Sequence, residues 1–134
     1  MEFTGRCYCG ALRYKVDGEP VAKAQCHCRE CQYISGGGPS YFIALPCDSF
    51  AYTRGKPTHF IRQDIDNPCT RDFCKTCGTH IKTSRPERPL AVVKVGTMDD
   101  PSLYGGANVA IFTCDMQDFH NIADGVQTFD KRPG

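Results

Sequence analysis

Alternating apolar and polar residues along the chain predict short β-strands. The clearest example begins at Leu12, where Leu12, Tyr14 and Val16 alternate with the charged residues at 13, 15 and 17, the period-two pattern of a half-buried strand. Glycine, proline, asparagine and aspartate between the apolar runs predict turns. We predict further strands over residues 21–25, 40–45, 50–53, 59–63, 70–74, 80–84, 91–95 and 108–113.

Helical patterns are weak in this sequence. Residues 29–34 predict one helical turn, residues 116–122 predict a second short helix, and no amphipathic segment of ten or more residues is present. Residues 35–39 contain three consecutive glycines and predict a flexible loop, without the lysine and following helix of a phosphate-binding loop. The pattern predicts a mainly β protein of short antiparallel strands, with residues 1–134 as one domain.

Composition narrows the class of protein. A chain of 134 residues with 40% apolar residues is long enough for one globular core. The net charge of +1 favours neither a nucleic-acid partner nor a membrane surface, and no run approaches the roughly 20 apolar residues that span a bilayer. Because the first residues lack a signal-peptide core, we expect a cytoplasmic protein. Ten cysteines in a reducing compartment indicate metal binding rather than disulfides.

Three of these cysteines fall within six residues. Cys26, Cys28 and Cys31 have C-x-C-x2-C spacing, which can place three thiolates on one zinc ion. Zinc prefers four ligands, so a fourth ligand from the protein would make the site structural, whereas water or a substrate atom would make it chemical. Either outcome is open at this point, and so is the source of a fourth ligand, which could come from the isolated residues Cys47, Cys69 and Cys114 or from a distant histidine. We expect each isolated cysteine to be a small buried side chain, and His27 to point away from the metal.

Two further cysteine pairs, Cys7 with Cys9 and Cys74 with Cys77, have no local partners, and together they make a four-thiolate set. A glycine follows the second cysteine of each pair, and we expect it to take the left-handed conformation that turns backbone N–H groups toward sulfur. Nearby cations that could offset the charge of such a site are Arg6, Arg71 and Lys75. A redox dithiol at Cys74 and Cys77 or a disulfide framework are the alternatives.

The order of these motifs resembles the glutathione-dependent formaldehyde-activating enzyme family, which includes centromere protein V. The resemblance rests on Gly5-x-Cys7-x-Cys9-Gly10, the Cys26 triplet, Cys74-x2-Cys77-Gly78 and a Gly-x-x-Asp-Asp-Pro segment at residues 96–101, and it covers residues 3–115. It differs at one point, because many members carry a histidine at or near the position of Ala110.

The resemblance implies a zinc-stabilised β-tent with two zinc ions. In such proteins the pairs matching Cys7/Cys9 and Cys74/Cys77 hold a structural zinc, whereas the triplet matching Cys26, Cys28 and Cys31 holds a labile zinc that is linked to catalysis. The implied activity is that of an S-(hydroxymethyl)glutathione synthase, a carbon–sulfur lyase that joins glutathione to formaldehyde.

Glutathione, or a similar thiol, would enter beside the triplet and add to formaldehyde or a similar aldehyde. The nearest sequence candidates for binding the carboxylates of glutathione are Arg29, Gly36 and Gly37. The alternative function is a non-catalytic zinc-stabilised module that binds proteins. Such a module would be expected to carry a basic or proline-rich extension, whereas this chain has only a short polar end. Its oligomeric state is open.

Overall fold

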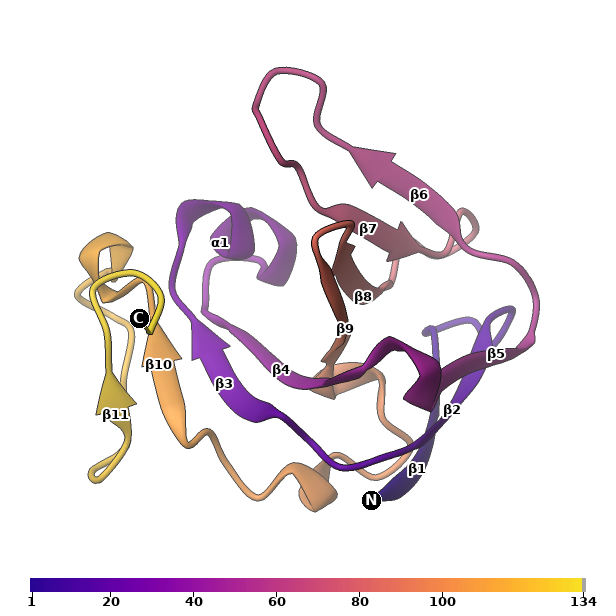
Figure 1. The fold of residues 1–134 in the computed structure, drawn as a ribbon, viewed down its shortest axis with the longest axis horizontal. Helices are drawn as coiled ribbons and strands as arrows, with labels where there is room; N and C mark the ends of the chain where they lie inside the picture. The colour runs from indigo at the N-terminus through magenta and orange to yellow at the C-terminus, as the bar shows by residue number, and fades with distance from the viewer. Residues whose placement is uncertain (134) are drawn as a thin grey trace.

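The structure is a computed structural model that describes residues 1–133. Its strands form two sheets, and one short α-helix lies beside the larger sheet (Figure 1). The three-stranded sheet has the order β1-β2-β5, and the eight-stranded sheet has the order β11-β10-β3-β4-β9-β8-β7-β6. The strands are β1 (Glu2–Arg6), β2 (Arg13–Asp17), β3 (Ala22–Cys26), β4 (Ser40–Pro46), β5 (Phe50–Arg54), β6 (Thr58–Ile61), β7 (Thr70–Phe73), β8 (His80–Arg85), β9 (Arg88–Lys94), β10 (Val109–Ile111) and β11 (Gln127–Thr128).

The helical elements are brief. Helix α1 (Arg29–Ser35) begins directly after Cys28, the second cysteine of the triplet. Its C-cap is Gly36, which has a φ of 87°. The 3-10 helices are η1 (Cys47–Ser49), η2 (Val95–Thr97), η3 (Pro101–Tyr104) and η4 (Thr113–Asp115).

The hydrophobic core lies between the small sheet and one face of the large sheet. Leu12, Tyr14 and Val16, the inward positions predicted from the alternation, are all buried there. They pack with Ile43 of β4 and Val93 of β9 in the same core cluster. Burial of each large apolar side chain of this kind contributes roughly 1.5–3 kcal/mol.

The other face of the large sheet forms the wall of a pocket. Because side chains alternate along a strand, β4 turns Ile43 toward the core and Phe42 toward the pocket, and β9 likewise turns Val93 and Val92 to opposite sides. The large sheet therefore has the hydrophobic core on one face and the pocket on the other.

The mainly β prediction is confirmed, and the predicted strands occur with ends shifted by at most three residues, whereas the two-residue strand β11 was not predicted. The predicted helix over residues 116–122 is wrong, because His120 and Gln117 of this segment are held individually by hydrogen bonds to His27 and to Gln32 of α1. Most pairs are antiparallel as predicted, but β10 pairs in parallel with both β3 and β11. Among residues 1–133, no helix has the length and apolar content to cross a membrane.

Strand β1 was not predicted, because its sequence carries one large apolar residue and a glycine. Gly5 is needed at its position, since a Cβ there would lie 2.3 Å from the ring of Tyr14. The Tyr14 hydroxyl continues past Gly5 to Thr97 Oγ1 at 2.8 Å. This crossing of ring over backbone is a tertiary contact that the local pattern does not predict.

Candidate metal centres

The first cysteine group joins the two distant pairs, as predicted. The sulfur atoms of Cys7, Cys9, Cys74 and Cys77 all lie within 4.8 Å of one another. Cys9 Sγ lies 3.7 Å from Cys7 Sγ and 3.8 Å from Cys74 Sγ. A tetrahedron with Zn–S bonds of about 2.3 Å has sulfur–sulfur edges of about 3.8 Å. All ten cysteines are free, and these separations are far beyond the roughly 2 Å of a disulfide, so the donor set suits a four-coordinate metal.

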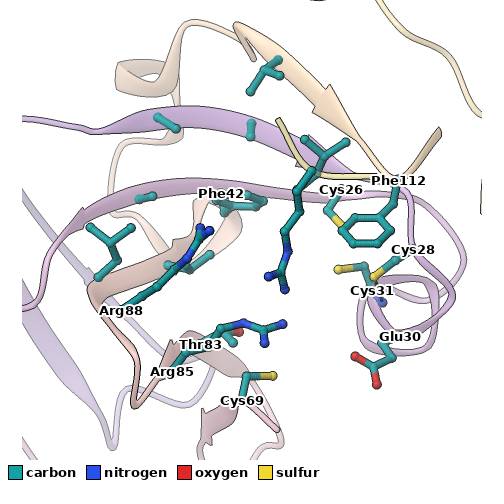
Figure 2. A pocket seen from close by; sticks show the side chains of 18 of the residues that line it. Cys26, Cys28, Glu30, Cys31, Phe42, Cys69, Thr83, Arg85, Arg88 and Phe112 are labelled. Carbon is teal, nitrogen blue, oxygen red and sulfur yellow. Dashed lines mark hydrogen bonds between the residues drawn. The ribbon is translucent and has the colours of Figure 1, made fainter. Parts of the chain in front are cut away.

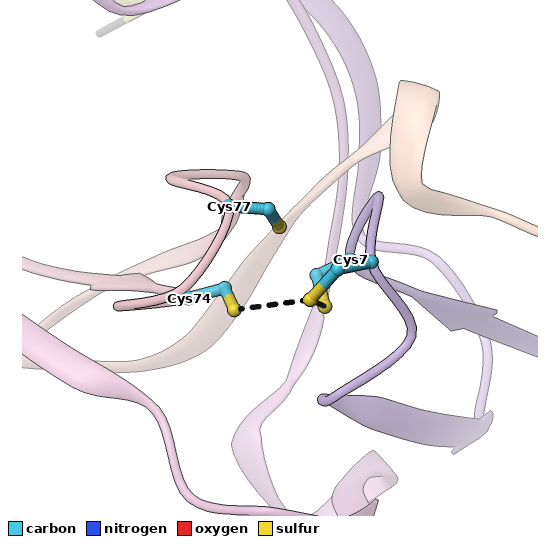
Figure 3. Close-up of side chains that lie close together, drawn as sticks. Cys7, Cys74 and Cys77 are labelled. Atoms are coloured by element: carbon cyan, nitrogen blue, oxygen red, sulfur yellow. Dashed lines mark hydrogen bonds between the residues drawn. The ribbon is translucent and has the colours of Figure 1, made fainter.

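Two tight turns present these sulfurs. Gly10 and Gly78 follow the second cysteine of each pair and have φ values of 82° and 78°, which confirms the expected left-handed conformation. The Gly10 N–H donates to the Cys7 carbonyl at 3.1 Å, and the Gly78 N–H donates to the Cys74 carbonyl at 2.8 Å. Figure 3 shows Cys7 facing Cys74 and Cys77 across the gap between the two turns.

Hydrogen bonds to individual sulfur atoms stabilise their thiolate form. The Leu12 N–H lies 3.2 Å from Cys7 Sγ, and the Thr79 hydroxyl lies 3.2 Å from Cys77 Sγ. The hydrogen bond with Thr79 lowers the pKa of Cys77 to about 5. Arg71, one of the cations expected near this four-cysteine group, lies in the pocket instead, where its guanidinium binds Glu30 at 3.0 Å.

The second group is the triplet at the junction of β3 and α1. Cys26 is the last residue of β3, Cys28 is the N-cap of α1, and Cys31 lies in the first turn of that helix. Their sulfur atoms lie within 4.8 Å of one another, and the Cys31 N–H donates to Cys28 Sγ at 3.4 Å. Cys26 and Cys31 are buried, and Cys28 is partly exposed.

Protons are shared unevenly within this triplet. Hydrogen bonds from Cys26 and Cys31 lower the pKa of Cys28 to about 2, whereas the hydrogen bond to Cys28 raises the pKa of Cys26. One thiolate therefore forms readily, and its charge opposes ionisation of its neighbours. A divalent cation among the three sulfurs would offset that repulsion, so the donor set also suits a metal.

His27, between two cysteines of the triplet, faces away from the sulfurs. The Gln25 side-chain N–H donates to the Asn121 carbonyl at 3.2 Å and to His27 Nε2 at 3.0 Å. His27 Nδ1 then donates to His120 Nδ1 at 2.9 Å, and His120 Nε2 donates to the Gly37 carbonyl at 2.7 Å. In this chain His27 Nε2 accepts a hydrogen bond, as a neutral imidazole can, and burial lowers the pKa of His27. As expected, His27 is not part of the sulfur cluster.

The three sulfurs open into a pocket with a volume of about 540 Å³, a size typical of small-ligand sites. Figure 2 shows Cys28 and Cys31 at one side of this pocket and Arg88 at the other, with Phe42 in the wall between them. Its apolar wall consists of Val21, Ala22, Ala24, Phe42, Ala44, Leu90, Val92, Val109, Ile111 and Phe112.

Within residues 1–133, no fourth cysteine, histidine or carboxylate joins the triplet to make a closed ligand set. Cys69 is buried and lines the same pocket, but its sulfur lies outside the cluster. Cys47 and Cys114 are exposed, so the expectation that they are buried was wrong. The open side of the triplet therefore faces the pocket.

Charged side chains surround the triplet. Glu30 of α1 accepts hydrogen bonds from Arg71 at 3.0 Å and from Arg62 at 2.6 Å, which joins the helix to the loop after β6. Lys94 donates to Ser40 Oγ at 3.1 Å, and burial lowers the pKa of this ammonium group. Sequence reasoning missed Lys94, although a lysine inside the apolar run 91–95 is a signal that could have found it.

The structure places the predicted glutathione contacts in two different regions. Arg29 lines the pocket, donates to Gln32 Oε1 at 2.5 Å and stacks its guanidinium over Tyr33. Gly36 and Gly37 are not among the residues that line the pocket. Ala110, the position where many relatives carry histidine, is fully buried and also lies outside that lining, between its pocket-facing neighbours Val109 and Ile111.

Comparisons with known proteins agree with this arrangement. The family model described as "Glutathione-dependent formaldehyde-activating enzyme" matches residues 2–115. A Halomonas elongata protein named "Putative glutathione-dependent formaldehyde-activating enzyme" is 29% identical over 109 residues, which are 77% of this chain and 69% of that protein. A crystal structure of a Rhodobacter sphaeroides protein superposes with a TM-score of 0.62 over 78% of this chain and 96% of its own. At 21% identity, that likeness concerns the fold alone.

The fold and the two cysteine groups define a small β protein with donor sets suited to metal, one of which opens into a pocket. The family match covers most of the chain and includes all seven of the clustered cysteines. The chain belongs to the glutathione-dependent formaldehyde-activating enzyme family.

Proposed function

We propose that this protein is a zinc-dependent carbon–sulfur lyase of the S-(hydroxymethyl)glutathione synthase type. In this proposal Cys7, Cys9, Cys74 and Cys77 hold a structural zinc, and Cys26, Cys28 and Cys31 hold a labile zinc at the site of reaction. Its substrates are glutathione, or another thiol, and formaldehyde, or another small aldehyde. The observation that carries the proposal is that the triplet faces a ligand-sized pocket and has no fourth side-chain donor within the described chain.

The reaction forms one carbon–sulfur bond without any change of oxidation state. The sulfur lone pair of the thiol attacks the aldehyde carbon, and the π electrons of the C=O bond move to oxygen. The proton released from the thiol is balanced by a proton gained by that oxygen, through water. The product is a hydroxymethyl thioether, and the reverse reaction returns the thiol and the aldehyde.

When bound at the triplet, zinc would supply a positive charge that keeps an incoming thiol deprotonated near neutral pH. Cys26, Cys28 and Cys31 would hold it on one side and leave the pocket side for substrate. Arg71 lines the same pocket and, together with Glu30, holds the start of α1 in place through ion pairs. The apolar wall around Phe42 would limit the water beside the reacting carbon, so that both small molecules are held at attack distance.

Substrate contacts in this proposal begin with Arg29, which lines the pocket one residue after Cys28. The loop that contains Gly36 and Gly37 was predicted to contact glutathione, and that role stays a prediction. In the present structure the Gly37 carbonyl accepts a hydrogen bond from His120, which fixes the loop beside the helix.

The test is to measure hydroxymethyl exchange between glutathione and formaldehyde by NMR, with protein that contains two zinc ions per chain. The wild-type protein should accelerate exchange over buffer, and Cys28→Ser should abolish that acceleration. Cys114→Ser is the matched control, because Cys114 is an exposed thiol outside both clusters, and it should react like the wild type. Exchange at the buffer rate by the zinc-loaded wild type would exclude the enzyme and leave the non-catalytic binding module.

A further inference from the structure

The pocket carries far more positive charge than the rest of the molecule. Six cationic side chains line it against two carboxylates, whereas the whole chain has a net charge of +1. Both carboxylates already have partners, because Glu30 binds two arginines and Asp115 accepts the backbone N–H of Arg29. The six cations are Arg29, Arg71, Arg85, Arg88, Lys94 and Arg132.

Three of these cations come from the β8–β9 hairpin and the C-terminal segment, and the proposed chemistry uses none of them. Arg85 ends β8, Arg88 begins β9, and Arg132 lies in the C-terminal segment. Arg85 has a single distant carboxylate partner, Glu87 at 3.8 Å, and within residues 1–133 neither Arg88 nor Arg132 forms an ion pair. Burial, together with repulsion from the guanidinium groups of Arg85 and Arg88, lowers the pKa of Arg132, whereas the nearby Cys26 raises it, so Arg132 lies near the other two arginines and also near the triplet. Like charges gathered in this way favour a bound anion.

Backbone pairing with the end of β10 brings Arg132 to the pocket. The Phe112 N–H donates to the Lys131 carbonyl at 3.0 Å, and the Thr113 N–H donates to the Phe129 carbonyl at 3.2 Å. The Arg132 guanidinium lies 5.9 Å from the centre of the Phe112 ring. The family model matches residues 2–115, so Arg132 lies outside the matched region.

The pocket therefore has two chemically different ends. Cys28 and Cys31 lie at one side and Arg88 at the other, with Phe42 in the wall between them (Figure 2), and Arg132 lies near Phe112 and Cys26. A thiol that reaches the triplet would extend along this wall, past Arg132, and bring its far end to Arg85 and Arg88. Guanidinium groups bind carboxylates through paired hydrogen bonds, and Arg88 and Arg132 have guanidinium groups that no carboxylate of the described chain engages.

We propose that Arg85, Arg88 and Arg132 form a subsite that binds the carboxylate end of an elongated thiol substrate. This assignment rests on the proposed function, and it deepens that function by making a remote anionic group a requirement for substrate. Neutral thiols of the same length would lack this interaction.

The experiment measures binding of S-methylglutathione by isothermal titration calorimetry. This probe keeps both carboxylates but has no free thiol, so its binding does not depend on the reaction. Wild-type protein should bind it at least tenfold more tightly than the diethyl ester of the same compound, and added salt should weaken binding of the acid more than that of the ester. Arg88→Gln and Arg132→Gln should each weaken binding of the acid about tenfold and leave the weak binding of the ester unchanged.

Arg54→Gln is the matched control, since Arg54 is an exposed arginine of β5 away from the pocket, and its binding should equal that of the wild type. Equal affinity for acid and ester, unaltered binding in both pocket variants, or no binding of the acid by the wild type would each overturn the subsite. Hydroxymethyl exchange is measured separately. Its absence alongside arginine-dependent binding would reject the enzyme and keep the subsite, whereas exchange without that dependence would reject the subsite alone.

Discussion

Replacing Cys77 with serine should unfold the protein, whereas replacing Cys28 with serine should leave it folded with one zinc fewer. The four-cysteine group joins parts of the chain that are far apart, since Cys9 and Cys74 are separated by 65 positions. Cys7 and Cys74 are 1% and 2% exposed and belong to the hydrophobic core. A structural zinc of this kind contributes roughly 10–16 kcal/mol of apparent folding free energy, which is comparable to the roughly 5–15 kcal/mol stability of a typical domain.

The Cys28 variant differs for a structural reason. Cys28 is partly exposed at the pocket, and its backbone is the N-cap of α1. Serine is among the best N-cap residues, so the helix keeps a hydrogen-bond acceptor at its start. We expect the apo stability of Cys28→Ser to lie within about 1 kcal/mol of the wild type without its labile metal.

The assay combines zinc content by mass spectrometry with urea unfolding followed by far-ultraviolet circular dichroism. Wild-type protein should hold two zinc ions, Cys28→Ser one, and Cys77→Ser should show no cooperative transition. Cys114→Ser controls for loss of an exposed thiol and should match the wild type in both measurements. If Cys28→Ser and Cys77→Ser lost the same amount of zinc and the same stability, the division between structural and labile sites would be wrong.

Two further predictions concern the small sheet. Gly5→Ala should lower the free energy of unfolding by about 3 kcal/mol, because the new Cβ would lie 2.3 Å from the Tyr14 ring. Gly96→Ala is the control and should have little effect, because the space around Gly96 is open. Equal urea midpoints for the two variants would contradict this prediction. Asp99 accepts hydrogen bonds from Thr4 at 2.6 Å and from Arg13 at 2.8 Å, and these partners lower its pKa. Asp99→Asn should therefore cost about 0.5–1 kcal/mol at neutral pH, and the difference should vanish as the pH falls below the lowered pKa, since protonated aspartic acid loses the same contribution. A difference that stayed constant from pH 7 to pH 2 in urea unfolding would exclude this charge effect.

Local sequence was enough to predict most strands, because their residues alternate between a solvent-exposed face and a buried face. Residues 12–16 are the clearest example, with all three predicted inward side chains buried. The same logic failed for β1, whose glycine is required by a tyrosine from the neighbouring strand. It also failed for residues 116–122, where hydrogen bonds to His27 and α1 replace helical ones.

The cysteine groups could be paired from spacing, since thiolates separated by one or two residues can share a metal. The position of the Arg71 side chain could not be predicted from spacing. Arg71 is close to Cys74 in sequence, which suggested the four-cysteine group, whereas its guanidinium binds Glu30 in the pocket. The positions of Arg85, Arg88 and Arg132 could not be predicted either, because no motif connects them. Only the return of the C-terminal segment along β10 brings the third of them to the pocket.

The sequence by itself determined the class of fold, the two sulfur clusters and their family, because each depends on residue types at short, fixed spacing. Tertiary structure decided that the triplet opens into a pocket lined by an apolar wall and by six cationic side chains. That outcome depends on which face of each strand is turned away from the core and on which distant segments meet there. Such contacts are set by the packing of the whole chain, so no local pattern contains them.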